Sequence, residues 1–265
     1  MSIRPLFDPE KMGRPMRVAG FMSGSGTNIM KLIERGKNLI SQEGFSPFEV
    51  SFIFSDRSDG SCRGERIAYE AGIPYFSYDI ASFHRKRGLK RTVNTPEGLS
   101  ARGEFDRVAK RLVRAFETDV IALGGYMSYI TLDRCVNVHP ADLSILTPDG
   151  KRRYVGDRAV MDAISSGETT LRSSTLWIDH GVDTGPLLMV SNPLRVKLPE
   201  PLESLIKNRD RLAEVADAHQ ERLKEVGDWR IFPRTIEMIA RGRFALDELN
   251  QVYVDGRPFP QGYRE

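Results

Sequence analysis

The sequence has few of the residues from which disulfide frameworks and metal centres are built. Of its 265 residues, only two are Cys (Cys62 and Cys135) and four are His. Two cysteines cannot form a disulfide framework or a cysteine-based zinc site, and no spacing of His, Asp and Glu indicates a metal site. The signatures of a covalent hydrolytic nucleophile, such as G-x-S-x-G, are also missing. We therefore expect chemistry that uses no metal and no such nucleophile.

Long apolar runs and a strong charge of one sign are missing as well. No apolar run approaches the roughly 18 residues of a membrane span. The polar N-terminal stretch MSIRPLFDPEKMGRPMR lacks the apolar core of a signal peptide. The formal net charge is +3, whereas a dedicated nucleic-acid binder carries a strongly basic face. We expect a cytoplasmic protein that binds neither membranes nor nucleic acids.

What the sequence does contain is a regular alternation of strand and helix patterns. The stretch RVAGFM (17–22) is typical of a buried strand, and it runs through the glycine turn SGSGTN (23–28) into helical apolar spacing. The same order repeats, with strands predicted at 48–55, 73–79 and 120–126 and helices at 62–72 and 103–119. Such alternation predicts an α/β fold with a parallel sheet, whose ligands gather at the carboxyl ends of the strands.

The second half of the sequence is less regular. Strands are predicted at 135–139, 173–179, 187–194 and in the closing VYVDGRPFPQGY, and helices at 157–167, 199–226 and 234–244. Two basic, turn-rich stretches, 84–102 and 144–155, are predicted to be exposed loops. His84, His180 and His219 are expected at the surface, since they lie in polar or charged surroundings.

The glycine turn is a candidate anion site. Free N–H groups and the positive end of a helix dipole meet where a helix follows a strand, and glycines allow an anion to approach the main chain. SGSGTN is neither the dinucleotide fingerprint nor a P-loop. Two interpretations remain open, a phosphate-binding loop and a tight turn with a Ser or Thr cap.

A second candidate site follows the predicted strand CVNVH. Asn137 and His139 are two residues apart on a strand, so they share one face and could both donate to one developing oxyanion. The alternative is a polar pair satisfied within the core. A carboxylate would be needed to orient the imidazole, and Asp183 in DHGVDTGPLL is the best candidate, with Asp179 second.

Taken in order, these motifs resemble the folate-dependent formyltransferases. The resemblance rests on GFMSGSGTNIMKLIE, FIFSDRSDG, ERIAYEAGIP, VIALGGYMSYIT, VNVHPADL, DHGVDTGPLL and VDGRPFPQGY. It covers residues 16–265 apart from the two basic stretches and 199–226, and the ending QGY is most similar to the phosphoribosylglycinamide formyltransferase (GAR transformylase) branch. The resemblance implies an N-terminal extension (1–15) and a formyltransferase domain (16–265). In that domain a Rossmann-like parallel sheet (16–130) would be extended by a mixed C-terminal portion (131–265).

The resemblance also implies a reaction and a set of site residues. A formyl group would pass from 10-formyltetrahydrofolate to the amine of glycinamide ribonucleotide, a step of purine biosynthesis. The catalytic residues would be Asn137, His139 and Asp183, and Asp228 would meet the ribose. The substrate phosphate would lie on Ser25, Gly26, Thr27 and Asn28. Folate would lie on Tyr126, Met127, Ser128, Tyr129, Ile130, Asp179 and His180.

Several residues depart from the pattern of that branch. The text after His-Pro, ADLSILTPDGKRRYVG, is longer; Ser128 stands where Arg is common, Leu176 where His is frequent, and Asp228 where Glu is usual. We therefore retain three alternatives: transfer to another amine such as an amino sugar nucleotide, hydrolysis of formyltetrahydrofolate, and ligand binding without catalysis. The expected partners are small molecules, with a homodimer as an open alternative.

Overall fold

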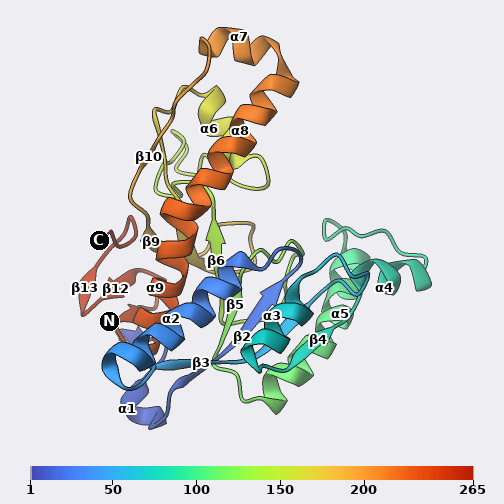
Figure 1. Ribbon diagram of the computed structural model, residues 1–265, viewed down its shortest axis with the longest axis vertical. Coiled ribbons are helices and arrows are strands. Elements are labelled where there is room, and N and C mark those ends of the chain that lie inside the picture. Colours follow the sequence, from blue (N-terminus) through green and yellow to red (C-terminus); the bar gives the residue numbers. More distant parts are fainter. Residues whose placement is uncertain (1, 265) are drawn as a thin grey trace. The chain divides into compact units, whose positions relative to one another are not determined.

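The structure is a computed structural model that describes residues 2–264 (Figure 1). It divides into two compact units. The N-terminal unit is Phe7–Val136, and the C-terminal unit combines residues 2–6 with residues 137–264. The boundary falls inside strand β6 (Cys135–His139), the strand that was predicted to carry Asn137 and His139.

The N-terminal unit is built on parallel strands. The strands are β2 (Met16–Met22), β3 (Phe48–Ser55), β4 (Tyr75–Ser77) and β5 (Val120–Leu123), in the order β4-β3-β2-β5. The helices are α1 (Pro9–Met12), α2 (Thr27–Glu43), α3 (Gly64–Ala71), α4 (Ile80–Lys86) and α5 (Pro96–Ala115). Helix α2 packs on β2 and β3, and α3 packs on β3 and β4.

Apolar packing explains why this unit forms. Phe21, Phe52 and Phe54 are fully buried, and the ring of Phe21 lies 4.9 Å from that of Phe54. Each such side chain contributes about 1.5–3 kcal/mol on burial. Gly20 lets α2 approach β2 closely, because a Cβ there would lie 3.1 Å from the Ile29 side chain. The continuous apolar runs seen in the sequence are therefore strands that helices cover.

The C-terminal unit is mixed. Around β6 it contains β8 (Ser174–Trp177), antiparallel to β9 (Leu187–Val190), and a separate pair of β7 (Thr170–Leu171) with β10 (Leu194–Arg195). A small antiparallel sheet has the order β1 (Arg4–Pro5), β11 (Phe244–Leu246), β12 (Val252–Val254) and β13 (Arg257–Pro258). The helices are α6 (Ala159–Ser165), α7 (Leu202–Lys207), α8 (Arg209–Leu223), the π-helical turn η1 (Lys224–Asp228) and α9 (Trp229–Ala240).

The seven strands of the main sheet have the order β4-β3-β2-β5-β6-β8-β9. The predicted α/β class is confirmed, with parallel strands in the N-terminal half and mixed strands in the C-terminal half. Helix α9 packs on β8 and β9. It begins at Trp229, five residues before the predicted start, and contains Pro233.

The prediction that 84–102 is an exposed loop is correct only for residues 87–95, which form neither helix nor strand and are largely exposed. Helix α4 extends to Lys86, and α5 begins at Pro96 instead of 103. Thr95 caps α5, since its Oγ1 accepts a hydrogen bond from the Gly98 N–H at 3.1 Å. The Arg102 side chain, at the end of the stretch, is only 2% exposed because its guanidinium is paired inside the unit.

The prediction for 144–155 is only partly correct. Leu146 and Arg152 form an antiparallel bridge, and Tyr154 is 3% exposed. His84 and His219 are also buried, contrary to expectation, whereas His180 is exposed. His219 is satisfied by main chain: its Nε2 accepts from the Lys197 N–H at 3.1 Å, and its Nδ1 lies 2.7 Å from the Val215 carbonyl oxygen.

Candidate active site

The glycine turn leads directly into α2, as the anion interpretation requires. Gly26 is the N-cap residue and has a φ of 67°, in the left-handed region. A Cβ at this position would lie 2.2 Å from Met22 Cε, so a side chain would fit neither the space nor the dihedral angle. Ser25 is exposed, and Thr27 Oγ1 donates to Ser25 Oγ at 3.3 Å. The hydroxyls of Ser25 and Thr27 and the amide of Asn28 thus lie at the N-terminus of a 17-residue helix, where the first backbone N–H groups are free.

The segment predicted to meet folate, Tyr126–Ile130, follows β5 in the same unit. The Met127 N–H donates to Ser23 Oγ at 2.9 Å, which ties this segment to the first residue of the glycine turn. Tyr126 and Ile130 are buried, Tyr129 is half-buried, and Met127 is 62% exposed.

Ser128 has charged neighbours that were not singled out from the sequence. Ser128 Oγ donates to Asp56 Oδ2, and Arg91 Nη2 donates to Ser128 Oγ at 2.6 Å. The guanidinium of Arg91 lies 3.8 Å from Asp56 Oδ2. A guanidinium therefore stands beside position 128 although residue 128 itself is Ser.

In the C-terminal unit, the structure brings His139 and Asp183 together. His139 Nδ1 lies 3.5 Å from Asp183 Oδ2, and the two residues are 6% and 9% exposed. Asn137 is half-buried two residues earlier on β6, so its side chain projects from the same face of the strand as that of His139. The three residues that were predicted as a catalytic set thus belong to one unit, and two of them form a buried pair.

The surroundings of His139 act on its pKa in opposite directions. Burial is the largest influence and lowers the pKa below its ordinary value, while Asp183 and the Tyr154 carbonyl raise it and Arg152 lowers it. His139 Nε2 lies 3.1 Å from the Tyr154 carbonyl oxygen. Each ring nitrogen faces an oxygen acceptor, an arrangement that suits the two N–H donors of the charged ring, whereas a neutral ring can donate to only one of them. Burial nevertheless disfavours the charged form.

Arg152, which sequence reasoning missed, holds the loop that carries Asp183. Its guanidinium donates to the carbonyl oxygens of Asp183 and Gly185, the second at 2.6 Å. Asp183 has a φ of 53°, and its Oδ2 also accepts from the Gly156 N–H at 3.0 Å. The strained backbone of Asp183 is therefore held from both sides by the longer segment after His-Pro.

Asp179 and His180, the other predicted folate residues, begin the same loop. Asp179 Oδ1 accepts from the Gly181 N–H at 2.9 Å and from Thr184 Oγ1 at 2.7 Å. A pocket of about 350 Å³ lies beside this loop, with Arg152, Asp179, Thr184 and Gly185 among its lining residues. A concave, partly polar surface of this kind is typical of a small-molecule site.

Asp228, predicted to meet a ribose, lies at the end of η1 and is 5% exposed. Its Oδ1 accepts from Ser173 Oγ at 2.5 Å, which ties the π-helical turn to the residue just before β8. Gly227 permits this contact, because a Cβ there would lie 2.4 Å from Ser173 Oγ.

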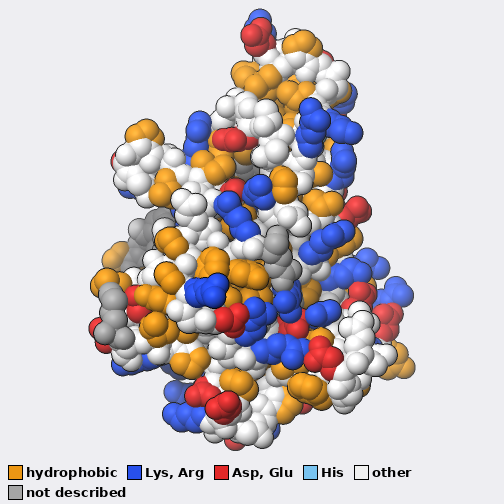
Figure 2. Space-filling view, turned by 90° about the vertical axis from the view of Figure 1, so that its left-hand side faces the viewer, with side chains coloured by type: hydrophobic (Ala, Val, Ile, Leu, Met, Phe, Trp, Pro, Cys, Tyr) orange, Lys and Arg blue, Asp and Glu red, His pale blue; other side chains and the backbone are white. Residues whose placement is uncertain are grey.

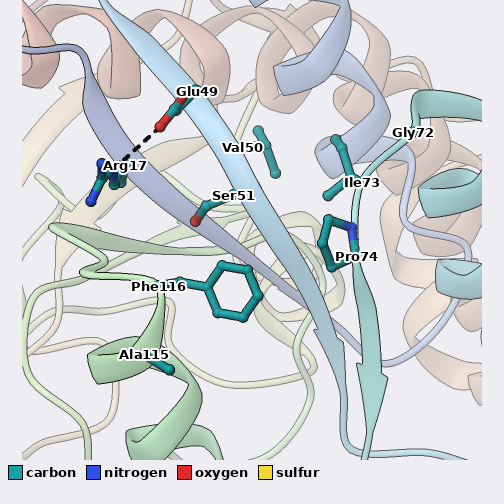
Figure 3. A pocket seen from close by; sticks show the side chains of 9 residues that line it. All are labelled: Arg17, Glu49, Val50, Ser51, Gly72, Ile73, Pro74, Ala115 and Phe116. Atoms are coloured by element: carbon teal, nitrogen blue, oxygen red, sulfur yellow. Dashed lines mark ion pairs between the residues drawn. The ribbon is translucent and has the colours of Figure 1, made fainter.

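A larger pocket, about 460 Å³, lies at the amino ends of β2 and β3, and Figure 3 shows its lining side chains. Arg17 at its rim pairs with Glu49 at 3.4 Å. None of the predicted site residues is among the described residues that line it. On the face drawn in Figure 2, basic, acidic and apolar side chains are interspersed.

Residues 2–264 show neither a metal centre nor a membrane span. They contain no group of three or more His, Cys, Asp or Glu placed to hold a metal ion. Within the same range, no helix has both the length and the apolar character that a bilayer crossing requires.

Comparisons with family models, curated proteins and solved structures agree with one another. Residues 16–216 match the formyl transferase family. Among curated proteins, the chain is similar to the trifunctional purine biosynthetic protein adenosine-3 of Drosophila melanogaster (25% identical over 237 residues, 86% of this chain) and of Homo sapiens (24% over 243 residues, 89% of this chain). The aligned parts make up 14% and 19% of those two proteins, so this chain spans only a small part of their length.

Solved structures show the same fold. The phosphoribosylglycinamide formyltransferase of Coxiella burnetii superposes with a TM-score of 0.65 at 22% identity, covering 95% of this chain and 99% of that one. A formyltetrahydrofolate deformylase from Pseudomonas syringae pv. tomato gives a TM-score of 0.58 at 16% identity, covering 91% of this chain and 66% of that one. Because the family match covers most of the sequence, the chain belongs to the formyl transferase family of enzymes.

Proposed function

We propose that this enzyme transfers a formyl group from 10-formyltetrahydrofolate to the amine of glycinamide ribonucleotide, a step of purine biosynthesis. The observation that carries the proposal is the buried His139–Asp183 pair next to Asn137 on β6, in a chain of the formyl transferase family. Two comparisons support the acceptor. The curated relatives are named as purine biosynthetic proteins, and the Coxiella burnetii structure as a phosphoribosylglycinamide formyltransferase.

In the proposed reaction the acceptor amine attacks the formyl carbon and a tetrahedral intermediate forms, with negative charge on the formyl oxygen. Asn137 and the charged form of His139 donate hydrogen bonds to that oxygen. The bond from the formyl carbon to N10 of the folate then breaks. One proton leaves the acceptor amine and one reaches N10, so protons balance, and Asp183 assists this transfer through a water molecule.

The lowered pKa of His139 gives this mechanism a defined starting state. In the ligand-free protein near pH 7.5 the imidazole is mostly neutral, because burial outweighs the attraction of Asp183. The charged form becomes more stable as the oxyanion develops beside it. The interaction is therefore stronger in the transition state than in the ground state, which is the condition for it to lower the barrier. For Nε2 to reach the formyl oxygen, His139 has to exchange its contact with the Tyr154 carbonyl for the substrate.

Binding roles follow the two units. The substrate phosphate lies on Ser25, Gly26, Thr27 and Asn28, whose turn has the geometry of an anion site at a helix N-terminus. The ribose meets Asp228. The folate lies on two segments, Tyr126 to Ile130 and the loop of Asp179 and His180 with its adjoining pocket. The enzyme works on small molecules.

One assay distinguishes this function from its alternatives. The protein is incubated with 10-formyltetrahydrofolate, with or without glycinamide ribonucleotide, and release of tetrahydrofolate is followed. Release that requires the ribonucleotide is the expected result. Release without any amine would identify a hydrolase instead. Release that requires an amino sugar nucleotide and not glycinamide ribonucleotide would overturn the acceptor and keep the chemistry.

A further inference from the structure

The segment Tyr126–Thr131 has no regular structure of its own to hold it. It is neither helix nor strand, and it connects β5 to β6 (Figure 1). A main-chain segment that has to bind a planar ligand needs fixed geometry, and here tertiary contacts must supply it. The contact of the Met127 N–H with Ser23 Oγ fixes one point in its middle.

Helix α5 carries a buried ion pair that contacts both ends of this segment. Arg102 and Asp106 are one helical turn apart, and each side chain is 2% exposed. Arg102 Nη2 donates to Asp106 Oδ1 at 2.5 Å, and Arg102 Nε donates to Asp106 Oδ2 at 3.1 Å. Such a forked pair has a defined geometry, so its two partners can act as one rigid anchor.

At the first end of the segment, the anchor holds Tyr126. Arg102 Nη2 donates to Tyr126 Oη at 2.9 Å. Burial raises the pKa of Tyr126 well above its ordinary value, so the hydroxyl stays protonated and serves as a neutral acceptor. The ring of Tyr126 also packs edge-on against Phe21 of β2, with the ring centroids 5.5 Å apart. Both the tip and the ring of Tyr126 are therefore fixed.

At the other end, the same pair holds Thr131. Asp106 Oδ2 accepts from the Thr131 N–H at 2.8 Å and from Thr131 Oγ1 at 2.8 Å. One carboxylate thus joins the arginine to the main chain at the end of the segment. Apolar contacts already pack this part of α5, because Ala101 and Phe105 form a buried cluster with Ile80 and Phe83. The ion pair therefore has another role than packing the helix.

We infer that the Arg102–Asp106 pair is a positioning device for the formyl donor: it fixes Tyr126–Thr131 at both ends so that the main chain between them can receive the folate. The two residues act through the segment and are not catalytic residues. The inference rests on the proposed function, because it assigns the segment to the donor. It predicts that loosening the pair weakens donor binding and leaves the acceptor site, on the glycine turn, nearly unchanged.

Two variants test the pair and one controls for its helix. The double variant Arg102→Met/Asp106→Leu replaces both charges by apolar groups, which avoids leaving one charge buried alone. Thr131→Val removes the hydroxyl that Asp106 accepts and keeps the shape of the side chain; it serves if the double variant fails to fold. The control is Arg107→Met on the same helix, where the side chain is 67% exposed and its guanidinium pairs with Glu104 at 3.6 Å.

The readout is the KM for each substrate, together with the thermal midpoint. In the double variant the KM for 10-formyltetrahydrofolate should rise about tenfold or more, the loss expected when hydrogen bonds to charged groups are removed. Thr131→Val should show a smaller rise in the same direction. In both, the KM for glycinamide ribonucleotide should stay within about twofold of its original value, as should both constants in the control. An unchanged donor KM, or an equal rise in both KM values, would overturn the inference.

A direct titration with 5-formyltetrahydrofolate, a stable folate, separates this inference from the proposed function. If the unmodified enzyme binds the folate and the double variant binds it about ten times more weakly, the inference is supported. If both bind it equally well, the positioning role is wrong and the proposed function stands. If the unmodified enzyme binds no folate, the proposed function and the inference are both overturned.

Discussion

The substitution Asp183→Asn should abolish most of the activity without unfolding the protein. Asn is nearly isosteric with Asp, and it tolerates the left-handed backbone that Asp183 adopts at a φ of 53°. Its side-chain oxygen can still accept from the Gly156 N–H, and Arg152 contacts only main-chain oxygens of this loop. The change therefore removes the negative charge that faces His139, and it leaves in place the hydrogen bonds that hold the loop.

The charge removed lies 3.5 Å from the imidazole, in a site where both residues are buried. Two unit charges about 4 Å apart attract each other by about 4 kcal/mol at an effective dielectric constant of 20. Part of this attraction is offset by the cost of dehydration, so we expect kcat to fall about 100-fold or more, which corresponds to about 2.7 kcal/mol in the barrier. The pKa of His139 should fall further, because Asp183 is the largest influence that raises it.

The assay combines steady-state formyl transfer with an NMR titration of the His139 ring protons and a thermal melt. The matched control is Asp157→Asn, an exposed carboxylate that also raises the pKa of His139, but less than Asp183 does; its kcat should stay within about twofold, because solvent screens that charge. If folded Asp183→Asn kept kcat within about threefold of the original value, the assigned role of the His139–Asp183 pair would be refuted.

Three further predictions follow from the same contacts. Gly26→Ala should raise the KM for the phosphorylated acceptor about tenfold or more, because its Cβ would lie 2.2 Å from the Met22 side chain. The control Gly24→Ala, whose Cβ would have nothing within 4 Å, should bind the acceptor normally. Equal KM values in the two variants would contradict the anion site. Stability measured by urea titration should fall as the pH drops below about 6.5, because burial lowers the folded-state pKa of His84 and His139 and the unfolded chain then binds more protons. His84→Gln should reduce that slope, and an unchanged slope would show that His84 does not contribute. Gly227→Ala should lower the free energy of unfolding by about 1–3 kcal/mol, because its Cβ would clash with Ser173. The control Gly103→Ala, with open space around its Cβ, should not destabilise the protein. Thermal unfolding of each variant tests this difference, and equal midpoints would contradict it.

The order of strands and helices could be predicted because the residues that pack in the core recur with the period of the helix or strand that carries them. β2 and β3 are apolar runs since helices cover them, and α2 begins after a glycine turn as expected. The predicted loop at 84–102 was too long at both ends, because its basic composition was given more weight than its local signals. Thr95, Pro96 and Glu97 together form an N-terminal helix signature, which would have placed the start of α5 correctly.

The candidate site could be predicted only in part. The spacing of Asn137 and His139 on one strand follows from β geometry, but the pairing with Asp183 joins residues 44 positions apart, and the motif order of a known family suggested it. Arg91, Arg102 and Arg152 were not singled out. Each is an Arg in a basic stretch, where a solvated side chain is the ordinary expectation, and only tertiary contacts show that they hold Ser128, Tyr126 and the Asp183 loop.

The most direct test of the central claim follows the formyl carbon itself. The enzyme is given 10-formyltetrahydrofolate labelled with ¹³C in the formyl group, together with glycinamide ribonucleotide, and the products are separated and analysed by mass spectrometry. The label should appear in an amide on the ribonucleotide, and His139→Ala should reduce the rate of its appearance by about 100-fold or more. Label recovered only as formate, or an undiminished rate in the folded His139→Ala variant, would contradict the central claim.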